Sequence, residues 1–114
     1  MTDIVQHVSR FRGVDGCVIG KEDGTILAGT LPEGQNDKTL HAFAPHLLKK
    51  VSRYIEPLQL GHIKRFTVTT NAKPMSIFKA GAVVMVLTHP APKLLNSVLK
   101  RGVELTEELS KSQN

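Results

Sequence analysis

The chain has 114 residues, of which 40% are hydrophobic and 22% are charged, and its formal net charge is +5. This length suits one domain with its own core, and the composition is ordinary for a soluble globular protein rather than a disordered one. The single cysteine, Cys17, excludes an internal disulfide and a multi-cysteine metal site. Residues 1–13 lack a basic-then-apolar leader pattern, and the longest apolar run, 82–87, is too short for a membrane span. We therefore expect a cytoplasmic protein.

The positive charge raises the question of a nucleic acid or an anionic membrane as partner. Basic residues occur singly or in pairs, as Lys49 with Lys50 and Lys64 with Arg65, and no aromatic residues lie between them to stack bases. We interpret the charge as a mildly basic solvated surface and expect no nucleic-acid partner.

The first predicted element is a helix that starts at residues 2–3 and stops at Gly13. Its apolar residues, Ile4, Val5, Val8 and Phe11, share one side. Two short β-rich runs follow, at 14–20 and 25–31. The pair Asp23-Gly24 between them supplies the positive φ angles of a tight turn, so the two runs predict a β-hairpin.

The longest helix-periodic segment is 37–60, and Asn36 or Asp37 is expected to cap it. Pro45 predicts a kink or the true first turn, and Pro57 predicts a loosened last turn before Gly61. One apolar stripe is typical of a helix that lies on a core: Leu40, Ala44, Leu47, Leu48, Val51, Ile55 and Leu58. A second stripe, Phe43, Leu47, Lys50 and Tyr54, has more apolar surface than the outward face of a monomer needs.

Three strands are predicted next, at 63–70, 75–79 and 82–88. The first alternates like a half-buried strand, and the last is apolar throughout, like a central strand covered on both faces. A final helix is expected with Pro92 in its first turn, and Gly102 inside it indicates close contact with a neighbour. Its apolar side contains Leu94, Leu95, Val98, Leu99, Val103, Leu105 and Leu109. The order predicts an α+β fold, in which a five-stranded antiparallel sheet has the long helix on one face and the terminal helices on the other.

Candidate chemical groups give no active site. The five histidines, His7, His41, His46, His62 and His89, lack metal-ligand spacing and are expected at surface or loop positions. Cys17 lies inside a strand and is interpreted as a small buried hydrophobe. No serine lies in a nucleophile elbow, and the glycines of 13–20 are not followed by a phosphate-binding Gly-Lys-Ser/Thr sequence. We expect neither an enzyme nor a bound cofactor or metal.

In combination, these features resemble the Roadblock family, the dynein light-chain and MglB-like domains, across nearly the whole chain. The stretches that carry the resemblance are GVDG at 13–16, DG at 23–24, ILA at 26–28, LG at 60–61 and VVMVL at 83–87. None is diagnostic alone, and the order and the length make the combination specific. The resemblance implies a single Roadblock-like, profilin-like domain over 1–110, with a polar tail at 111–114.

The resemblance also implies a dimer with a second copy or a related chain, in which the third strands pair edge to edge and the long helices pack antiparallel. The residues implied at this interface are Phe43, Leu47, Lys50, Tyr54, Ile63, Arg65, Thr67 and Thr69. In a monomer the same residues would belong to the solvated surface.

The function that the resemblance implies is that of a non-enzymatic scaffold, which binds a small Ras-like GTPase over the paired helices and modulates its nucleotide state. The residues expected to bind this partner are His46, Lys49, Lys50 and Arg53. Two alternatives are a structural adaptor of a motor or cell-polarity assembly without a GTPase, and a small-ligand sensor.

Overall fold

The computed structural model describes residues 2–71, 73–90 and 94–112. Its elements are, in chain order, α1 (Thr2–Ser9), β1 (Gly16–Lys21), β2 (Ile26–Thr30), α2 (Asp37–Ile55), the 3₁₀ turn η1 (Glu56–Leu58), β3 (Arg65–Val68), β4 (Met75–Ala80), β5 (Val83–Thr88) and α3 (Asn96–Ser112). This order and these element types agree with the prediction from the sequence.

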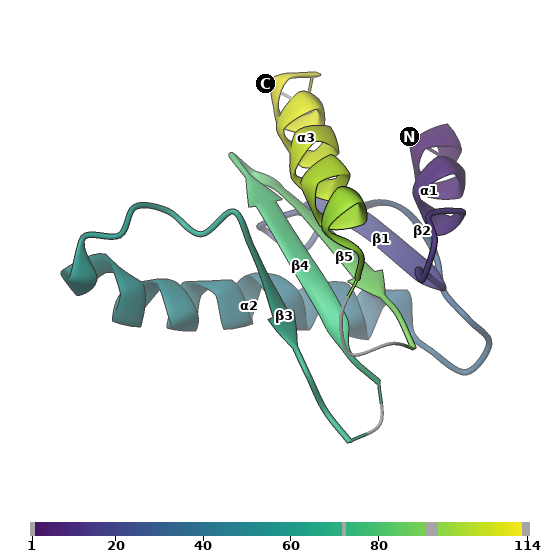
Figure 1. Cartoon of the computed structure of the whole chain (residues 1–114), viewed down its shortest axis with the longest axis horizontal. Helices are drawn as coiled ribbons and strands as arrows, with labels where there is room; N and C mark the ends of the chain where they lie inside the picture. The colour runs from purple at the N-terminus through teal and green to yellow at the C-terminus, as the bar shows by residue number, and fades with distance from the viewer. Residues whose placement is uncertain (1, 72, 91–93, 113–114) are drawn as a thin grey trace.

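The five strands form one antiparallel sheet in the order β2-β1-β5-β4-β3. α1 packs on β1 and β2, and α3 packs on β4 and β5. Both lie on one face of the sheet, and α2 crosses the opposite face (Figure 1). The predicted α+β architecture is therefore confirmed, with β5 at the centre of the sheet.

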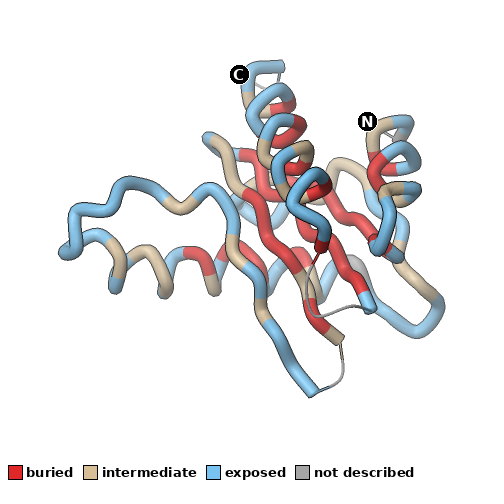
Figure 2. Tube along the Cα trace, viewed as in Figure 1, coloured by how far each residue is buried: buried red, intermediate tan, exposed pale blue. Residues whose placement is uncertain are grey.

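The core consists of two apolar layers separated by the sheet. Alternate residues of the fully buried β5 supply them, with Val83, Met85 and Leu87 on the α1 and α3 side and Val84 and Val86 on the α2 side. Figure 2 shows β5 as buried along its length. This accounts for its unbroken apolar sequence, because each face of the strand has a helical layer to cover.

The hairpin turn differs in detail from the prediction. Gly24 has a φ of +98°, whereas Asp23 does not adopt a positive φ. Asp23 instead accepts a hydrogen bond at Oδ1 from the backbone N–H of Thr25, at 2.9 Å. The aspartate therefore contributes a side-chain acceptor to the turn, and only the glycine contributes the left-handed conformation.

The helix ends also differ from the expected ones. α1 ends at Ser9, and Arg10 and Phe11 continue in a hydrogen-bonded turn before Gly13. α2 ends at Ile55 rather than at residue 60, because Pro57 has no N–H to extend it and the chain tightens into η1. Pro45 lies in the interior of α2 and does not mark its first turn.

α3 confirms the reason for its internal glycine. A Cβ on Gly102 would lie 2.7 Å from Cε2 of the fully buried Phe78, so the helix approaches β4 more closely than any other residue type permits. The helix continues through Lys111 and Ser112, which the sequence had assigned to a tail. The predicted position of Pro92 lies outside the described residues.

Polar groups fasten one end of the sheet. Asp15 accepts a hydrogen bond from the Thr88 hydroxyl, at 2.7 Å, and forms an ion pair with Lys73. Burial raises the pKa of Asp15, but the bonds from Lys73 and Thr88 outweigh it and lower the pKa below its usual value. Beside this group, Ser76 bonds to both Thr67 and the buried His89, each at 2.9 Å.

None of the described helices combines the length and apolarity that a membrane crossing requires.

Candidate functional site

The surface that the sequence singled out is built on α2. Asn36 begins this helix as its N-cap, accepting a hydrogen bond at Oδ1 from the Thr39 N–H at 3.1 Å. The helix has 19 residues and is therefore about 28 Å long. It packs mainly across β1, β2 and β5, and its C-terminal part projects past β3 at the sheet edge (Figure 1).

The inner stripe of α2 is only partly used within this chain. Ala44 and Leu48 are buried against Ile77, Val84 and Val86, and Leu40 and Leu47 pack at the margin of that cluster. Val51 and Ile55, expected to hold the helix to its own sheet, stay half-exposed and outside the cluster. The reason is that this part of α2 projects beyond the edge of the sheet and has no strand to pack on. Figure 2 shows this end of the helix as exposed.

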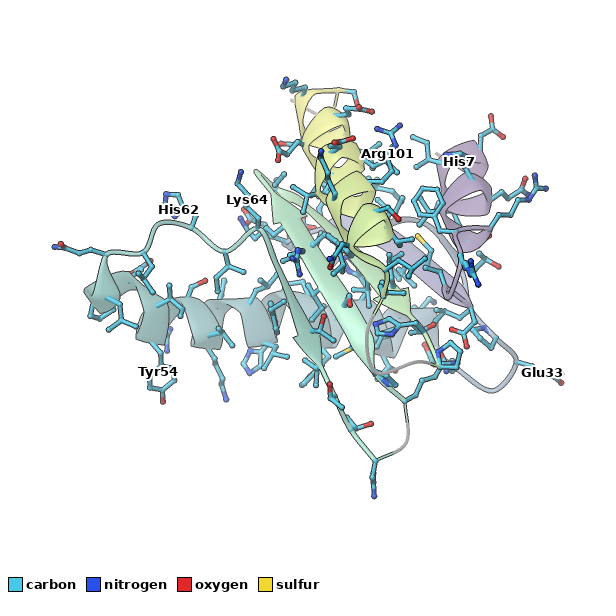
Figure 3. The ribbon with its side chains drawn as sticks, in the orientation of Figure 1. His7, Glu33, Tyr54, His62, Lys64 and Arg101 are labelled. Atoms are coloured by element: carbon cyan, nitrogen blue, oxygen red, sulfur yellow. The ribbon has the colours of Figure 1, made fainter. Side chains whose placement is uncertain are left out.

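The outer stripe exposes large apolar side chains. Phe43 is 47% exposed and Tyr54 is 81% exposed, and Leu58 and Leu60 are exposed just beyond the helix. Tyr54 points away from the sheet (Figure 3). Lys50 is exposed between the two aromatic residues, whereas Leu47 is half-buried because it also contacts the α2-side cluster.

The strand residues of the expected interface divide between the two faces of the sheet. β3 is the last strand, paired only with β4, so one of its edges is open. Arg65 and Thr67 are exposed and lie opposite Phe78 and Ser76, on the α3 side, while Ile63 packs against the α2-side cluster. Thr69 is exposed just past the end of β3.

Sequence reasoning missed two apolar residues on the α2 face of β3, Phe66 and Val68. Both are half-buried, and α2 itself runs closest to other strands. The alternation of the strand already placed them on one face. What the sequence did not contain is the path of α2, which leaves that face without full cover.

The expected partner-binding residues His46, Lys49, Lys50 and Arg53 are all exposed on α2. Lys49 and Arg53 line a cavity of about 320 Å³ between α2 and the ends of β1 and β4, and His46 and Lys49 line a neighbouring one of about 220 Å³ at the β1–β2 turn. Lys50 lines neither cavity and lies toward the outer stripe.

The residues that face α2 across these cavities were also not predicted from the sequence. They include Glu22 and Lys79, which form an ion pair of 3.6 Å, and Lys79 donates a further bond of 2.7 Å to the carbonyl of Gly81. The two residues are far apart in sequence, so only the pairing of β1 and β4 with β5 brings them together.

Two of the five histidines are buried, contrary to the prediction that all five lie at surface or loop positions. His41 is fully buried in α2, and His89 follows β5 in a loop but is fully buried as well. Within the described part of the chain, neither ring nitrogen of His41 has a hydrogen-bond partner. The ring lies so close to Gly20 that a Cβ at that position would clash with its Nε2.

The remaining reactive groups have structural settings. Burial raises the pKa of the Cys17 thiol to about 12, which confirms the reading of Cys17 as a small buried hydrophobe. No three histidine, cysteine, aspartate or glutamate side chains among the described residues gather as a metal site requires.

Two helices on one face of a five-stranded antiparallel sheet and one long helix on the other define a Roadblock-like fold. Solved structures with this fold include MglB of Myxococcus xanthus, with a TM-score of 0.82 at 11% identity over 96% of this chain and 91% of that one. An MglB structure with a tetrameric arrangement has a TM-score of 0.81 at 15% identity, over 96% of this chain and 87% of that one. A Roadblock/LC7 domain from Streptomyces avermitilis has a TM-score of 0.76 at 12% identity, over 99% and 96%. No family profile and no curated protein sequence matches the chain. The structural similarity shows that the chain has a Roadblock/MglB-like fold, at low sequence identity to these proteins.

Proposed function

We propose that the chain is a non-enzymatic regulator, which dimerises through α2 and β3 and binds a small Ras-like GTPase over the paired α2 helices. The observation that carries the proposal is the outer stripe of α2, where Phe43 and Tyr54 are exposed on a helix that also runs beyond its own sheet. An exposed apolar stripe of this kind is typical of an interaction surface.

The spacing along the stripe fits an antiparallel pair of α2 helices. Phe43 with Tyr54, and Leu47 with Lys50, are both centred on the midpoint between Leu48 and Lys49. A two-fold axis through this midpoint places Phe43 against the second copy's Tyr54, and Leu47 against its Lys50. The contact is then the same patch on both subunits, as a two-fold dimer requires.

The open edge of β3 supplies the second part of the proposed dimer contact. Edge strands present unpaired N–H and C=O groups, and pairing of two β3 strands would join the two sheets. The projecting end of α2 would then extend over the second copy's sheet. There its half-exposed Val51 and Ile55 would meet the incompletely covered Phe66 and Val68.

We infer that the effect on the GTPase is a shift between its conformations. A surface without catalytic groups acts only if it binds one nucleotide state more tightly than the other. The switch loops of such GTPases are ordered by the terminal phosphate of GTP, so they are the segments that the platform would distinguish.

Cross-linking with engineered cysteines tests the dimer. In the double variant Phe43→Cys/Tyr54→Cys, the two positions face each other across the pair, so oxidation is expected to give a covalent dimer. Each single variant is the control, because its two cysteines would be about 16 Å apart along the antiparallel helices. A strictly monomeric mass at micromolar concentration, with no cross-link in the double variant, would refute the dimer.

Binding to purified small GTPases, loaded with GDP or with a non-hydrolysable GTP analogue, tests the function. We expect a complex that forms preferentially with one nucleotide state, and that Phe43→Glu abolishes. Leu95→Glu is the matched control, since Leu95 has a similar exposure of 50% but lies just before α3. Equal binding in both states would refute the regulatory effect. The absence of any complex would refute a GTPase partner and favour the adaptor alternative.

A further inference from the structure

A groove runs along the flank of α2 that faces the β1–β2 turn. It consists of the two adjoining cavities, of about 320 and 220 Å³, which share Glu22, Pro45 and Lys49. Its floor is apolar, because Pro45 is buried and Leu48 is 3% exposed. On the helix surface, this flank and the outer stripe of Phe43 and Tyr54 point to opposite sides of the core-facing stripe. The groove is therefore open in a monomer and in the dimer proposed above.

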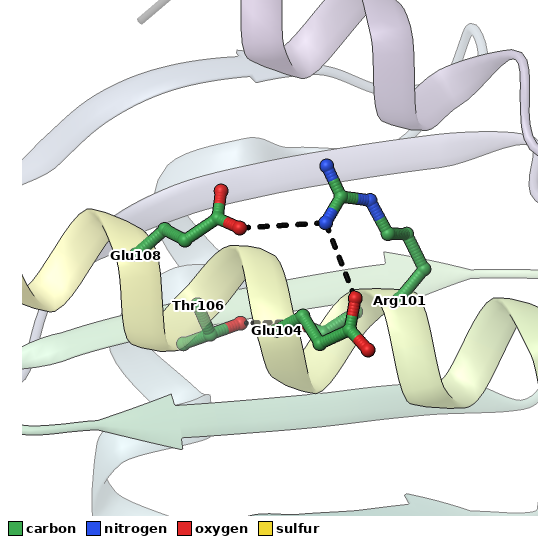
Figure 4. A network of polar contacts seen from close by, with 5 residues as sticks. Arg101, Glu104, Thr106 and Glu108 are labelled. Carbon is green, nitrogen blue, oxygen red and sulfur yellow. Dashed lines mark hydrogen bonds and ion pairs between the residues drawn. The ribbon is translucent and has the colours of Figure 1, made fainter.

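The helical wall of the groove is basic, and its charges are not neutralised within the chain. His46, Lys49 and Arg53 are exposed, and no ion pair involves them in the part of the chain that the structure describes. α3 gives the contrast, since Arg101 contacts Glu104 at 3.2 Å and Glu108 at 3.4 Å on its exposed side (Figure 4). The α2 cations thus remain available to an external partner.

The facing wall carries carboxylates that are already engaged. Glu22 is paired with Lys79, and Asp23 accepts the hydrogen bond from Thr25 that lowers its pKa. A third carboxylate, Glu56, lies in η1 directly after α2 and also lines the larger cavity. A flat anionic surface would meet these carboxylates as well as the cations, whereas a narrow chain can follow the basic wall and keep its distance from the acidic one.

We propose that this groove binds an acidic, extended segment of a partner protein. Carboxylates of the segment pair with Lys49 and Arg53, which are one helical turn apart on the basic wall, and an apolar side chain rests on Pro45 and Leu48. The net charge of +5 would steer such a segment to the protein. This inference rests on the proposed function to the extent that it gives the chemistry of one contact with the partner.

Fluorescence anisotropy with a labelled peptide of alternating glutamate and leucine tests the groove, beside a peptide that has glutamine in place of glutamate. We expect the glutamate peptide to bind at least about tenfold more tightly at low salt, and its advantage to fall as salt is raised. The variant Lys49→Glu/Arg53→Glu is expected to weaken binding at least about tenfold. The matched control Lys100→Glu/Lys111→Glu changes the net charge equally, on exposed positions of α3, and is expected to stay within about twofold of the unmodified protein.

Equal weakening in both charge-reversal variants, or equal binding of both peptides, would overturn the inference. So would binding to phosphatidylserine vesicles without binding to the glutamate peptide. The GTPase experiment separates this result from the proposed function. A groove that binds the acidic peptide in a protein that binds no GTPase refutes the function alone. A GTPase complex that tolerates Lys49→Glu/Arg53→Glu, in a protein that ignores the peptide, refutes the groove alone.

Discussion

Replacement of His41 by leucine should flatten the pH dependence of stability. The His41 ring is fully buried, without a hydrogen-bond partner among the described residues, and pressed against Gly20. Burial lowers the pKa of His41 below 6.5, although the backbone of Val84 and the Asp23 carboxylate favour the charged form. The folded protein therefore binds this proton less readily than the unfolded chain does.

The sign and the size of the effect follow from this difference. The contribution of His41 to stability is fully present above the unfolded pKa of 6.5 and is lost as the pH falls below it. Between pH 7.5 and 5.5 the loss is at most about 1.4 kcal/mol, the full value applying if the folded ring stays neutral throughout. His41→Leu removes this loss, so its free energy of unfolding should change less over the same interval.

Urea denaturation at pH 7.5 and 5.5 measures the difference directly. His62→Gln is the control, because it also removes a histidine, one exposed in the loop before β3, and leaves the buried His41 ring in place. Parallel pH dependences for His41→Leu and the unmodified protein would show that the ring is protonated equally easily in both states. The reasoning from its burial would then be wrong.

Three further changes have expected outcomes. Gly102→Ala places a Cβ 2.7 Å from the Phe78 ring. We expect the overpacking cost of about 1–3 kcal/mol to exceed the gain of about 1 kcal/mol in helix propensity, so the melting temperature should fall. An unchanged or higher melting temperature would refute the close contact. Asn36→Ala removes the α2 cap and should cost about 1 kcal/mol in urea denaturation, whereas Asn36→Asp should retain most of the stability; equal losses in both variants would contradict the capping role. The Cys17 thiol, with its pKa raised to about 12, should react with a thiol reagent at pH 8 only after unfolding, and rapid labelling of the native protein would contradict its burial.

Periodicity in the sequence was enough to predict the elements, because each one has a face to bury. β5 has two covered faces and reads as a continuous apolar run, and β3 has one and alternates. The turn at Gly24 and the close approach at Gly102 could also be predicted, since glycine in each place has a local reason. The predicted end of α2 at residue 60 was wrong, because the actual end depends on how the chain continues around Pro57 into η1.

The candidate site was predictable on α2 and not beyond it. His41, Ala44 and Leu48 share the spacing of a buried stripe, so the position of His41 in the sequence already indicated burial. We did not predict it, because the side chain is polar. The position of Gly20 beneath that ring had no such signal, because it depends on contacts between distant segments. The same holds for Glu22 and Lys79, whose meeting beside Lys49 requires the register of three strands.

The central pairing of β1 with β5 has a consequence for how the protein is made. Gly16 lies opposite Thr88, so the inner edge of β1 stays unpaired until β5 has been synthesised. Until then, Val18 and Ile19 belong to a two-stranded hairpin, which is marginally stable at best in water. Contacts this distant in sequence also slow folding. A growing chain that has not yet reached β5 therefore presents an aggregation-prone strand edge, and this is the stage at which a chaperone would contribute most to its yield.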